Sequence, residues 1–380
     1  MYIYIFAEVV MLVLVLFSNK ASSKQCNIFL LLCCSLWSLI FGLRGYNVGN
    51  DTPHYAGFFD GTNPAYGGYG TYKAPGETIE WGYIMINRFL SIFSSSATFL
   101  FLIHAFFLFS LIYILYKDKK SSIMSLIWLF SFGSMLTVMM VAMRQSFSVC
   151  FVLLSYILLA KLQEKNLSKK EMLKDKYFWF AFISFVFSVT VHRTSIFFFP
   201  VLLVLYFVRL NKKIIYALIF MALIVAALYK DLLSNFFDMG MFLIGGVEDD
   251  KISLLADRYR EDMENTGASF FSLIALISPV IVTTYLSKKN DINTLPYKSL
   301  IFGLVIFVLF SSSPVVSRIV LVFLILGYSV SVPKAVSKNR LLFLFYFMVS
   351  SYYLWRSIAH FYDDLASKNN TYIFYNFFWE

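Results

Sequence analysis

Residues 97–116 read ATFLFLIHAFFLFSLIYILY, an uninterrupted apolar run with one histidine and no charged side chain. A helix of about 20 such residues matches the roughly 30 Å hydrocarbon core of a bilayer. The run therefore predicts a membrane-spanning helix. Eleven further apolar runs predict spans of the same kind, at residues 2–18, 27–43, 122–141, 145–160, 177–191, 195–209, 213–229, 269–287, 298–313, 316–333 and 341–356.

The composition of the whole chain agrees with this prediction. Of the 380 residues, 59% are hydrophobic and 14% are charged, whereas soluble domains contain about 45–50% apolar and roughly 25% charged residues. So few charges cannot cover a water-exposed surface, which excludes a soluble enzyme, a disordered chain and a fibrous protein. We predict an all-α polytopic membrane protein of about twelve spans, with residues 1–380 forming a single integral membrane domain.

Three long apolar stretches are interrupted by polar residues, Arg144-Gln145, His192-Arg193 and Ser313-Pro314. Each interruption predicts a helical hairpin that turns at the membrane surface. Two connections are long, at residues 44–96 and 230–268, and a tail at residues 357–380 follows the last span. Within the first loop, the amphipathic stretch 83–93 predicts a helix along the interface. Loops of this length are usually functional or disordered, so we expect the site on their side.

Basic residues divide unequally between alternate loops. The loops at 19–26, 117–121, 161–176, 209–213, 288–298 and 334–340 hold 20 of the 32 Lys and Arg residues but only 5 of the 22 Asp and Glu residues. Loops rich in Lys and Arg remain in the cytoplasm. Both termini and the long loops are therefore predicted to lie outside it. The net charge of +10 reflects this topology and does not indicate nucleic-acid binding.

Arginine and lysine follow different distributions. Of 22 lysines, 18 fall in the predicted cytoplasmic loops, whereas eight of ten arginines fall on the outer side. A guanidinium suits bidentate recognition of phosphate or carboxylate, so an outer cluster predicts an anionic, lipid-linked phosphate or diphosphate. For any single arginine, the alternative is a side chain that reaches the headgroups from a helix end. The outer arginines are Arg44, Arg88, Arg144, Arg193, Arg258, Arg260, Arg318 and Arg356.

Three residues are candidates for proton transfer: Asp51, Glu80 and His192. His192 follows a predicted span, and the two carboxylates lie beside glycine-rich turns. The alternatives are helix capping by Asp51, a solvated loop position for Glu80 and a turn histidine at 192, while His104 within an apolar helix is predicted to be structural. The four cysteines, at positions 26, 33, 34 and 150, have no metal-ligand spacing and are predicted to be buried. No nucleotide-binding or metal motif is present, so no cofactor and no metal are expected.

Several short motifs follow one another in a distinctive order. Arg44-Gly45-Tyr46-x-x-Gly49-x-Asp51-Thr52-x-x-Tyr55 comes after the second predicted span, and Glu80-x-Gly82-Tyr83 follows it. Met143-Arg144-Gln145 and His192-Arg193-Thr194-Ser195 then each lie between two spans. In this order and topology the sequence resembles EpsG-like membrane proteins from about residue 1 to residue 330. The position after the histidine is usually small or polar in that family, so Arg193 is a departure.

The resemblance implies a Wzy-type polysaccharide polymerase of O-antigen, capsule or exopolysaccharide synthesis, in the bacterial cytoplasmic membrane, with a GT-C-like architecture. Its donor and acceptor would be oligosaccharides on polyprenyl (undecaprenyl) diphosphate, with a chain-length regulator as a further partner. The alternatives are a GT-C-type glycosyltransferase, an O-antigen ligase or a flippase for the same lipid-linked sugar. The roles expected are diphosphate binding by Arg44, Arg144, Arg193 and Arg318, base catalysis by Asp51, Glu80 or His192, and sugar or acceptor binding by Gln145, Tyr55, Trp81, Tyr83, Arg258 and Tyr259.

Overall fold

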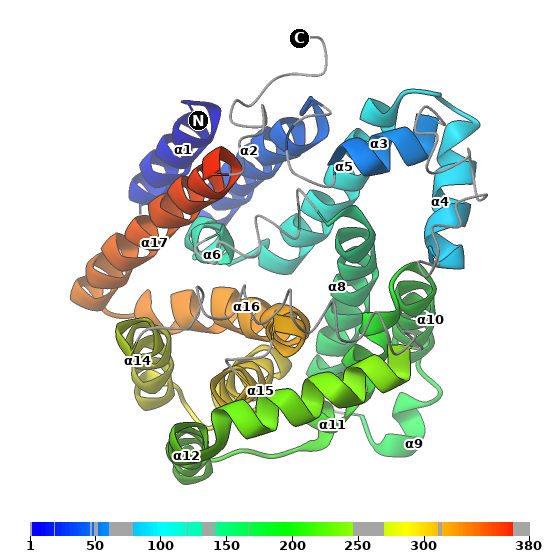
Figure 1. The fold of residues 1–380 in the computed structure, drawn as a ribbon. Helices are drawn as coiled ribbons and strands as arrows, with labels where there is room; N and C mark the ends of the chain where they lie inside the picture. The colour runs from blue at the N-terminus through cyan, green and yellow to red at the C-terminus, as the bar shows by residue number, and fades with distance from the viewer. Residues whose placement is uncertain are drawn as a thin grey trace. The chain divides into compact units, whose positions relative to one another are not determined.

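The computed structural model describes residues 2–367, with the exception of residues 19, 46–47, 49–51, 61–78, 120, 131–138, 140–141, 166, 246–269 and 311–313. At residues 169, 230–245, 270–275, 314–319, 321, 353 and 356–367 only the backbone is described. The described residues form helices joined by turns and include no β-strand (Figure 1). They divide into two compact units, Met1–Pro200 with Leu341–Glu380, and Val201–Arg340. The all-α prediction is confirmed.

The helices of the first unit carry the predicted site. They are α1 (Tyr2–Ser18), α2 (Ser23–Gly42), α3 (Thr52–Asp60), α4 (Trp81–Ser91), α5 (Ala97–Tyr116), α6 (Ser122–Phe130), α8 (Met143–Glu164), α9 (Lys169–Met172), α10 (Lys176–Val191), the 3₁₀ helix η2 (Arg193–Phe197) and α17 (Arg340–Ser367). The chain passes along α11 (Phe198–Phe207) into the second unit, which contains α12 (Lys212–Gly245), α14 (Phe270–Leu286), η3 (Asp291–Asn293), α15 (Leu295–Leu309) and α16 (Pro314–Val336).

Among the described residues, four helices are long and apolar enough to cross a membrane, namely α2, α5, α8 and the part of α12 up to Tyr229. Further apolar helical segments of 10–17 residues accompany them, including α1, α10 and α15. Each predicted run contains a helix, although α6 covers only the first part of the run at 122–141 and most of its remainder lies outside the described residues. The chain is therefore a polytopic membrane protein.

Two helices extend into segments predicted as loop and tail. α12 continues past residue 230 to Gly245, and α17 continues past residue 357 to Ser367. Neither helix contains a proline, the residue that most strongly stops a helix. The sequence becomes less apolar after residues 229 and 356, which is why these segments are predicted as loop and tail. The backbone nevertheless continues as helix, because loss of apolar character does not by itself break the hydrogen-bond ladder.

Within the first unit, the lysine-rich loops and the predicted site lie at opposite ends of the helices. Asn27 at the start of α2 exchanges two hydrogen bonds of 2.8 Å with Asp118, which follows α5. At the same end of its hairpin, Lys165 after α8 pairs with Asp175 before α10. Helices of about 20 residues are roughly 30 Å long. The other ends of α2, α5, α8 and α10 are therefore about one membrane thickness away.

Aromatic packing joins α2, α5 and α6. The rings of Trp37 and Phe130 stack with centroids 4.4 Å apart, and Phe41 meets Phe109 edge to face at 5.3 Å. All four side chains are buried. Such contacts between large rings contribute about 0.5–1.5 kcal/mol beyond the burial of their area, so this cluster holds α2 and α5 at a fixed separation.

In the second unit, two glycines allow α15 and α16 to approach closely. A Cβ at Gly303 would lie 2.6 Å from the backbone nitrogen of Leu324, and one at Gly327 would lie 2.3 Å from that of Leu300. Small residues at helix contacts are the usual way in which membrane helices gain packing energy. The pair therefore forms the centre of this unit.

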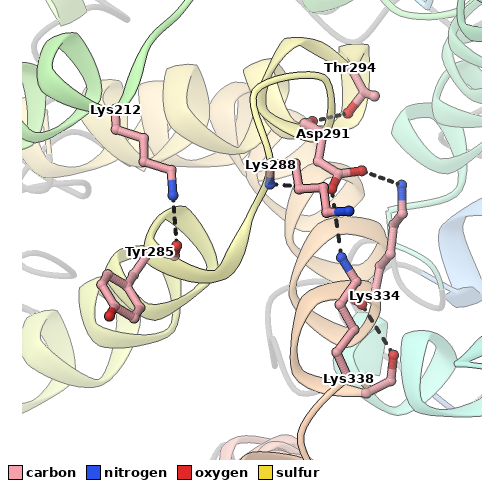
Figure 2. A network of polar contacts seen from close by, with 8 residues as sticks. Lys212, Tyr285, Lys288, Asp291, Thr294, Lys334 and Lys338 are labelled. Carbon is pink, nitrogen blue, oxygen red and sulfur yellow. Dashed lines mark hydrogen bonds and ion pairs between the residues drawn. The ribbon is translucent and has the colours of Figure 1, made fainter.

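Polar contacts hold the ends of α14, α15 and α16 together (Figure 2). The Asp291 carboxylate accepts a hydrogen bond of 2.9 Å from Lys334 and lies 3.7 Å from the Lys338 amine. Lys212 donates to the Tyr285 carbonyl at 2.7 Å, at the C-terminal end of α14 (Figure 2). All three lysines belong to loops that the sequence assigns to the cytoplasm, and the Asp291 carboxylate contacts two of them, Lys334 and Lys338.

Candidate functional site

Three residues far apart in the sequence meet in the first unit and form what we call the Glu80 cluster: Glu80, Arg144 and His192. Glu80 immediately precedes α4, Arg144 lies in the first turn of α8, and His192 follows the last residue of α10. One carboxylate oxygen of Glu80 accepts a hydrogen bond of 3.0 Å from Arg144 Nη1, and the other lies 3.1 Å from His192 Nδ1. The Glu80 side chain is only 10% exposed.

The turn after α10 places His192. Its backbone is extended, with φ −154° and ψ 117°, and this ends α10 before η2 begins. The Ser148 hydroxyl on α8 donates 2.9 Å to the Ser188 carbonyl and also pairs with the Ser195 hydroxyl. Ser148 thereby ties both sides of the turn to α8, which packs along α10 (Figure 1). The serine of the His-x-x-Ser motif thus fixes the histidine's backbone.

Gly82 brings α4 against α10. A Cβ built on Gly82 would lie 2.4 Å from the Thr190 hydroxyl and 2.7 Å from both the carbonyl carbon and the carbonyl oxygen of Thr190. No side chain larger than a hydrogen atom fits there without movement. Since Glu80 is two residues before Gly82 and His192 is two residues after Thr190, this close contact sets the separation of the acid and the histidine.

The partners of Glu80 keep it ionised. Burial by itself would raise the pKa of this carboxyl group, but the hydrogen bond from His192 and the positive charge of Arg144 outweigh burial and lower the pKa from 4.5 to about 2. A carboxylate with such a low pKa and with both oxygens engaged is a weak proton acceptor. The geometry assigns Glu80 to holding Arg144 and His192 in place.

The ionised carboxylate also fixes the tautomer of His192. Because a carboxylate only accepts hydrogen bonds, the imidazole proton facing it must be on Nδ1. In the neutral ring, Nε2 is then the free proton acceptor, and the His192 side chain is 23% exposed. The Arg144 guanidinium also has a hydrogen bond to Tyr55 and is 29% exposed. Of its five N–H donors, some therefore remain for an anionic ligand.

An apolar layer lies beneath the Glu80 cluster. It is built from α3, α4, α5, α8 and α10 and includes Phe59, Phe101 and Phe147. Arg44 is completely buried in this region, with its guanidinium 4.3 Å from the centroid of the Phe101 ring and its Nη2 3.2 Å from the Met143 sulfur. Arg44 thus sits next to the residue that precedes Arg144, and no part of its side chain reaches the surface.

The other predicted binding residues of the first unit lie at different depths. Tyr83 is completely buried, with its ring stacked on Phe58 at 5.9 Å, whereas the neighbouring Trp81 is 64% exposed. Burial in the apolar layer raises the pKa of the Tyr83 hydroxyl. Tyr55, Gln145 and Arg193 are at least partly exposed. These three, with Trp81, lie on elements that flank the Glu80 cluster.

The structure leaves several predicted site residues untested. Asp51, Arg258 and Tyr259 lie outside the described residues, and Arg318 is located in α16 of the second unit with only its backbone described. His104 is buried, and its Nε2 lies 2.8 Å from the Ser146 hydroxyl, as expected for a structural histidine. The four cysteines are free and buried, which confirms the prediction made from their positions.

Residue type and position predict all three members of the Glu80 cluster, but with separate tasks. Glu80 and His192 are rival candidates for the base, and Arg144 is predicted to bind phosphate alone. Their mutual hydrogen bonds could not be foreseen, because 64 residues separate Glu80 from Arg144 and 112 separate it from His192. Ser148 and Thr190 were missed altogether. Only Gly82 carried a signal, since glycine is the residue that permits a close approach of two backbones.

Among the described residues, no three His, Cys, Asp or Glu side chains are grouped so that they could hold a metal ion. No curated protein and no solved structure matches the chain. The sequence model of the EpsG family matches residues 26–377, which is nearly the whole sequence, and the chain belongs to the EpsG family.

Proposed function

We propose that the protein is a Wzy-type polymerase that joins oligosaccharide repeat units carried on polyprenyl diphosphate, at the outer face of the cytoplasmic membrane. Membership of the EpsG family supports a polysaccharide polymerase. The single observation that carries the proposal further is the Glu80 cluster, in which a carboxylate orients a histidine beside a partly exposed arginine. This combination suits transfer of a group from a phosphate ester to a hydroxyl.

The location of the Glu80 cluster supports the outer face. Its three residues lie at the ends of α8 and α10 opposite to the paired Lys165 and Asp175. The lysine-rich ends face the cytoplasm by the positive-inside rule. The cluster would then lie near the outer headgroups, at the depth where the phosphates of a lipid-linked sugar reside.

In the proposed reaction, His192 Nε2 removes the proton from the attacking hydroxyl of the acceptor glycan. The hydroxyl oxygen forms a bond to the anomeric carbon of the donor, and the bond from that carbon to the diphosphate oxygen breaks. Glu80 keeps the Nδ1 proton in place and stabilises the imidazolium that forms, as a carboxylate does for a catalytic histidine elsewhere. The leaving group is polyprenyl diphosphate, which departs with the bonding electron pair.

Arg144 would stabilise that leaving group. Negative charge accumulates on the diphosphate as the bond breaks, and a fixed guanidinium at this position stabilises the transition state more than the ground state. Its contact with Glu80 holds the guanidinium in one orientation before substrate binds. Arg193, which follows His192 directly and is exposed, would add a second positive charge on the same side.

Deletion of the gene in its own host tests this proposal. Surface glycan and lipid-linked intermediates are separated on a gel, and the deletion strain is complemented with the wild-type gene, Arg144→Ala or Arg88→Ala at matched expression. Arg88 lies on α4, so its variant controls for loss of an outer arginine. The polymerase predicts that the long ladder collapses to a single repeat unit and returns with wild type and Arg88→Ala but not with Arg144→Ala.

Other results identify the rival functions. Loss of even the single repeat with intermediates retained inside the cell would indicate a flippase. A single sugar missing from a ladder of unchanged length would indicate a side-branch glycosyltransferase. Full-length glycan that remains attached to its lipid carrier would indicate a ligase. Each of these outcomes would contradict the polymerase.

A further inference from the structure

Helix α4 exposes several large apolar side chains and buries one polar side chain. Its most exposed large side chains recur at helical spacing, and we call them the α4 stripe: Trp81, Met85, Phe89 and Ile92 just beyond the last turn. The opposite side contains Asn87, which is completely buried and whose amide donates to the Tyr83 carbonyl at 2.8 Å. A helix that faced water would carry mainly polar side chains on its exposed side. The α4 stripe therefore faces lipid.

Both ends of α4 are held at the site end of the bundle. Its first residue follows Glu80, which contacts Arg144 and His192. After its last turn, α5 begins at Ala97, and Leu90 packs in the same buried cluster as Ala97 and Leu100. Eleven residues of helix measure about 16 Å, about half of the roughly 30 Å needed to cross the hydrocarbon. α4 thus stays within one leaflet.

We infer that the α4 stripe is the docking surface for the isoprenoid chain of the lipid-linked substrate. This inference rests on the proposed function and adds the part of the site that binds the lipid. A diphosphate held by Arg144 must begin its hydrocarbon chain within a few ångströms of the Glu80 cluster. Trp81 is the residue directly after Glu80, so the α4 stripe starts where that chain starts.

The length and chemistry of the surface fit a single extended hydrocarbon chain. From Trp81 to Ile92 the stripe runs along one side of the helix for about 16 Å, and it consists of an indole, a thioether, a phenyl ring and a branched alkyl group. Phe89 and Phe93 pack edge to face at 5.4 Å, which continues the apolar surface past the helix end. Arg88, the one charged residue of α4, is also exposed on this side, three residues after Met85 and four before Ile92.

Photo-crosslinking from two matched positions tests the inference. A benzoylphenylalanine replaces Phe89 of the α4 stripe or, as the control, Phe106 of α5, which is 61% and 69% exposed respectively. The full-length protein is placed in nanodiscs with radiolabelled lipid-linked repeat units isolated from the deletion strain, and labelled glycan crosslinked to the protein is detected. If Arg144 holds the diphosphate of the substrate, crosslinking should be about tenfold higher at position 89 than at position 106. The bound headgroup raises the local concentration of its own hydrocarbon chain beside the α4 stripe.

A competition experiment and the Arg144→Ala variant distinguish bound substrate from bulk lipid. Excess unlabelled lipid-linked repeat unit, but not excess phospholipid, should suppress crosslinking at 89, and Arg144→Ala should remove the enrichment. Equal yields at both positions, or enrichment that Arg144→Ala leaves unchanged, would show that the α4 stripe contacts bulk lipid only and would overturn the inference. Chain extension by the wild-type protein is measured in the same nanodiscs: its absence alongside enrichment at 89 would contradict the polymerase proposal and not the docking surface.

Discussion

Substitution of Gly82 by alanine tests whether the close contact of α4 with α10 organises the site. The new Cβ would lie 2.4 Å from the Thr190 hydroxyl and 2.7 Å from its carbonyl carbon. An ordinary contact is about 3.4 Å, so the two backbones must separate by about 0.7 Å. The hydrogen bond between Glu80 and His192, now 3.1 Å, would lengthen to about 3.8 Å and be lost.

The substitution should lower both the stability of the protein and its reaction rate. Overpacking of this kind costs about 1–3 kcal/mol of stability, and a displacement on the order of 1 Å in a catalytic group lowers the rate about 100-fold. The assay is chain extension by purified protein, with thermal unfolding measured on the same sample. Gly303→Ala is the matched control, because its Cβ would also lie 2.6–2.7 Å from backbone atoms but in the second unit.

The expected result separates activity from stability. Both alanine variants should lose similar stability, but only Gly82→Ala should lose most of its rate. Because two of the three close atoms belong to the Thr190 backbone, Thr190→Gly should fail to rescue Gly82→Ala. A Gly82→Ala protein with the wild-type rate, or a Gly303→Ala protein with an equal loss of rate, would refute the idea that this contact positions His192.

Three further predictions concern single side chains. Arg144→Lys should lower the rate at least tenfold with normal folding, because an ammonium cannot contact Glu80 and a diphosphate with a planar fork of donors; rates equal to wild type would contradict this. Arg44→Ala should instead reduce the yield of folded protein in detergent, since Arg44 is buried against Phe101, and normal yield would show that its burial is not needed. The low pKa of Glu80 means that its carboxylate stabilises the fold above pH 4.5 and loses this contribution as the pH falls towards 2. The difference in unfolding temperature between wild type and Glu80→Gln should therefore shrink over that range, with a neutral-pH effect of up to about 3 kcal/mol; a constant difference would be inconsistent with the lowered pKa.

The membrane class and the position of most helices could be predicted from the sequence, because hydropathy acts over segments of the length that a bilayer requires. α5 begins and ends where its apolar run does. The ends of helices were harder to predict. α12 extends to Gly245 because no residue in its sequence interrupts the backbone hydrogen bonds. Several helices are also shorter than a full span, and apolar composition alone cannot distinguish these from complete crossings.

The candidate site shows the same division between local and long-range information. Glu80, Arg144 and His192 could each be named from residue type and position in a predicted outer turn. Their roles depended on contacts across 64 and 112 residues, which no local pattern encodes. Tyr83 illustrates the opposite case, since an aromatic residue beside Glu80 suggested sugar stacking, but its position on the inner side of α4 buries it completely.

The most direct test of the central claim is chain extension by purified protein reconstituted with lipid-linked repeat units, measured as polymer length on a gel. The account predicts a ladder of several repeat units with wild type, and only single units with Glu80→Gln, His192→Gln and Arg144→Ala proteins that are still folded at the assay temperature. Ladders of wild-type length from folded Glu80→Gln and His192→Gln proteins would contradict the claim that the Glu80 cluster performs the transfer.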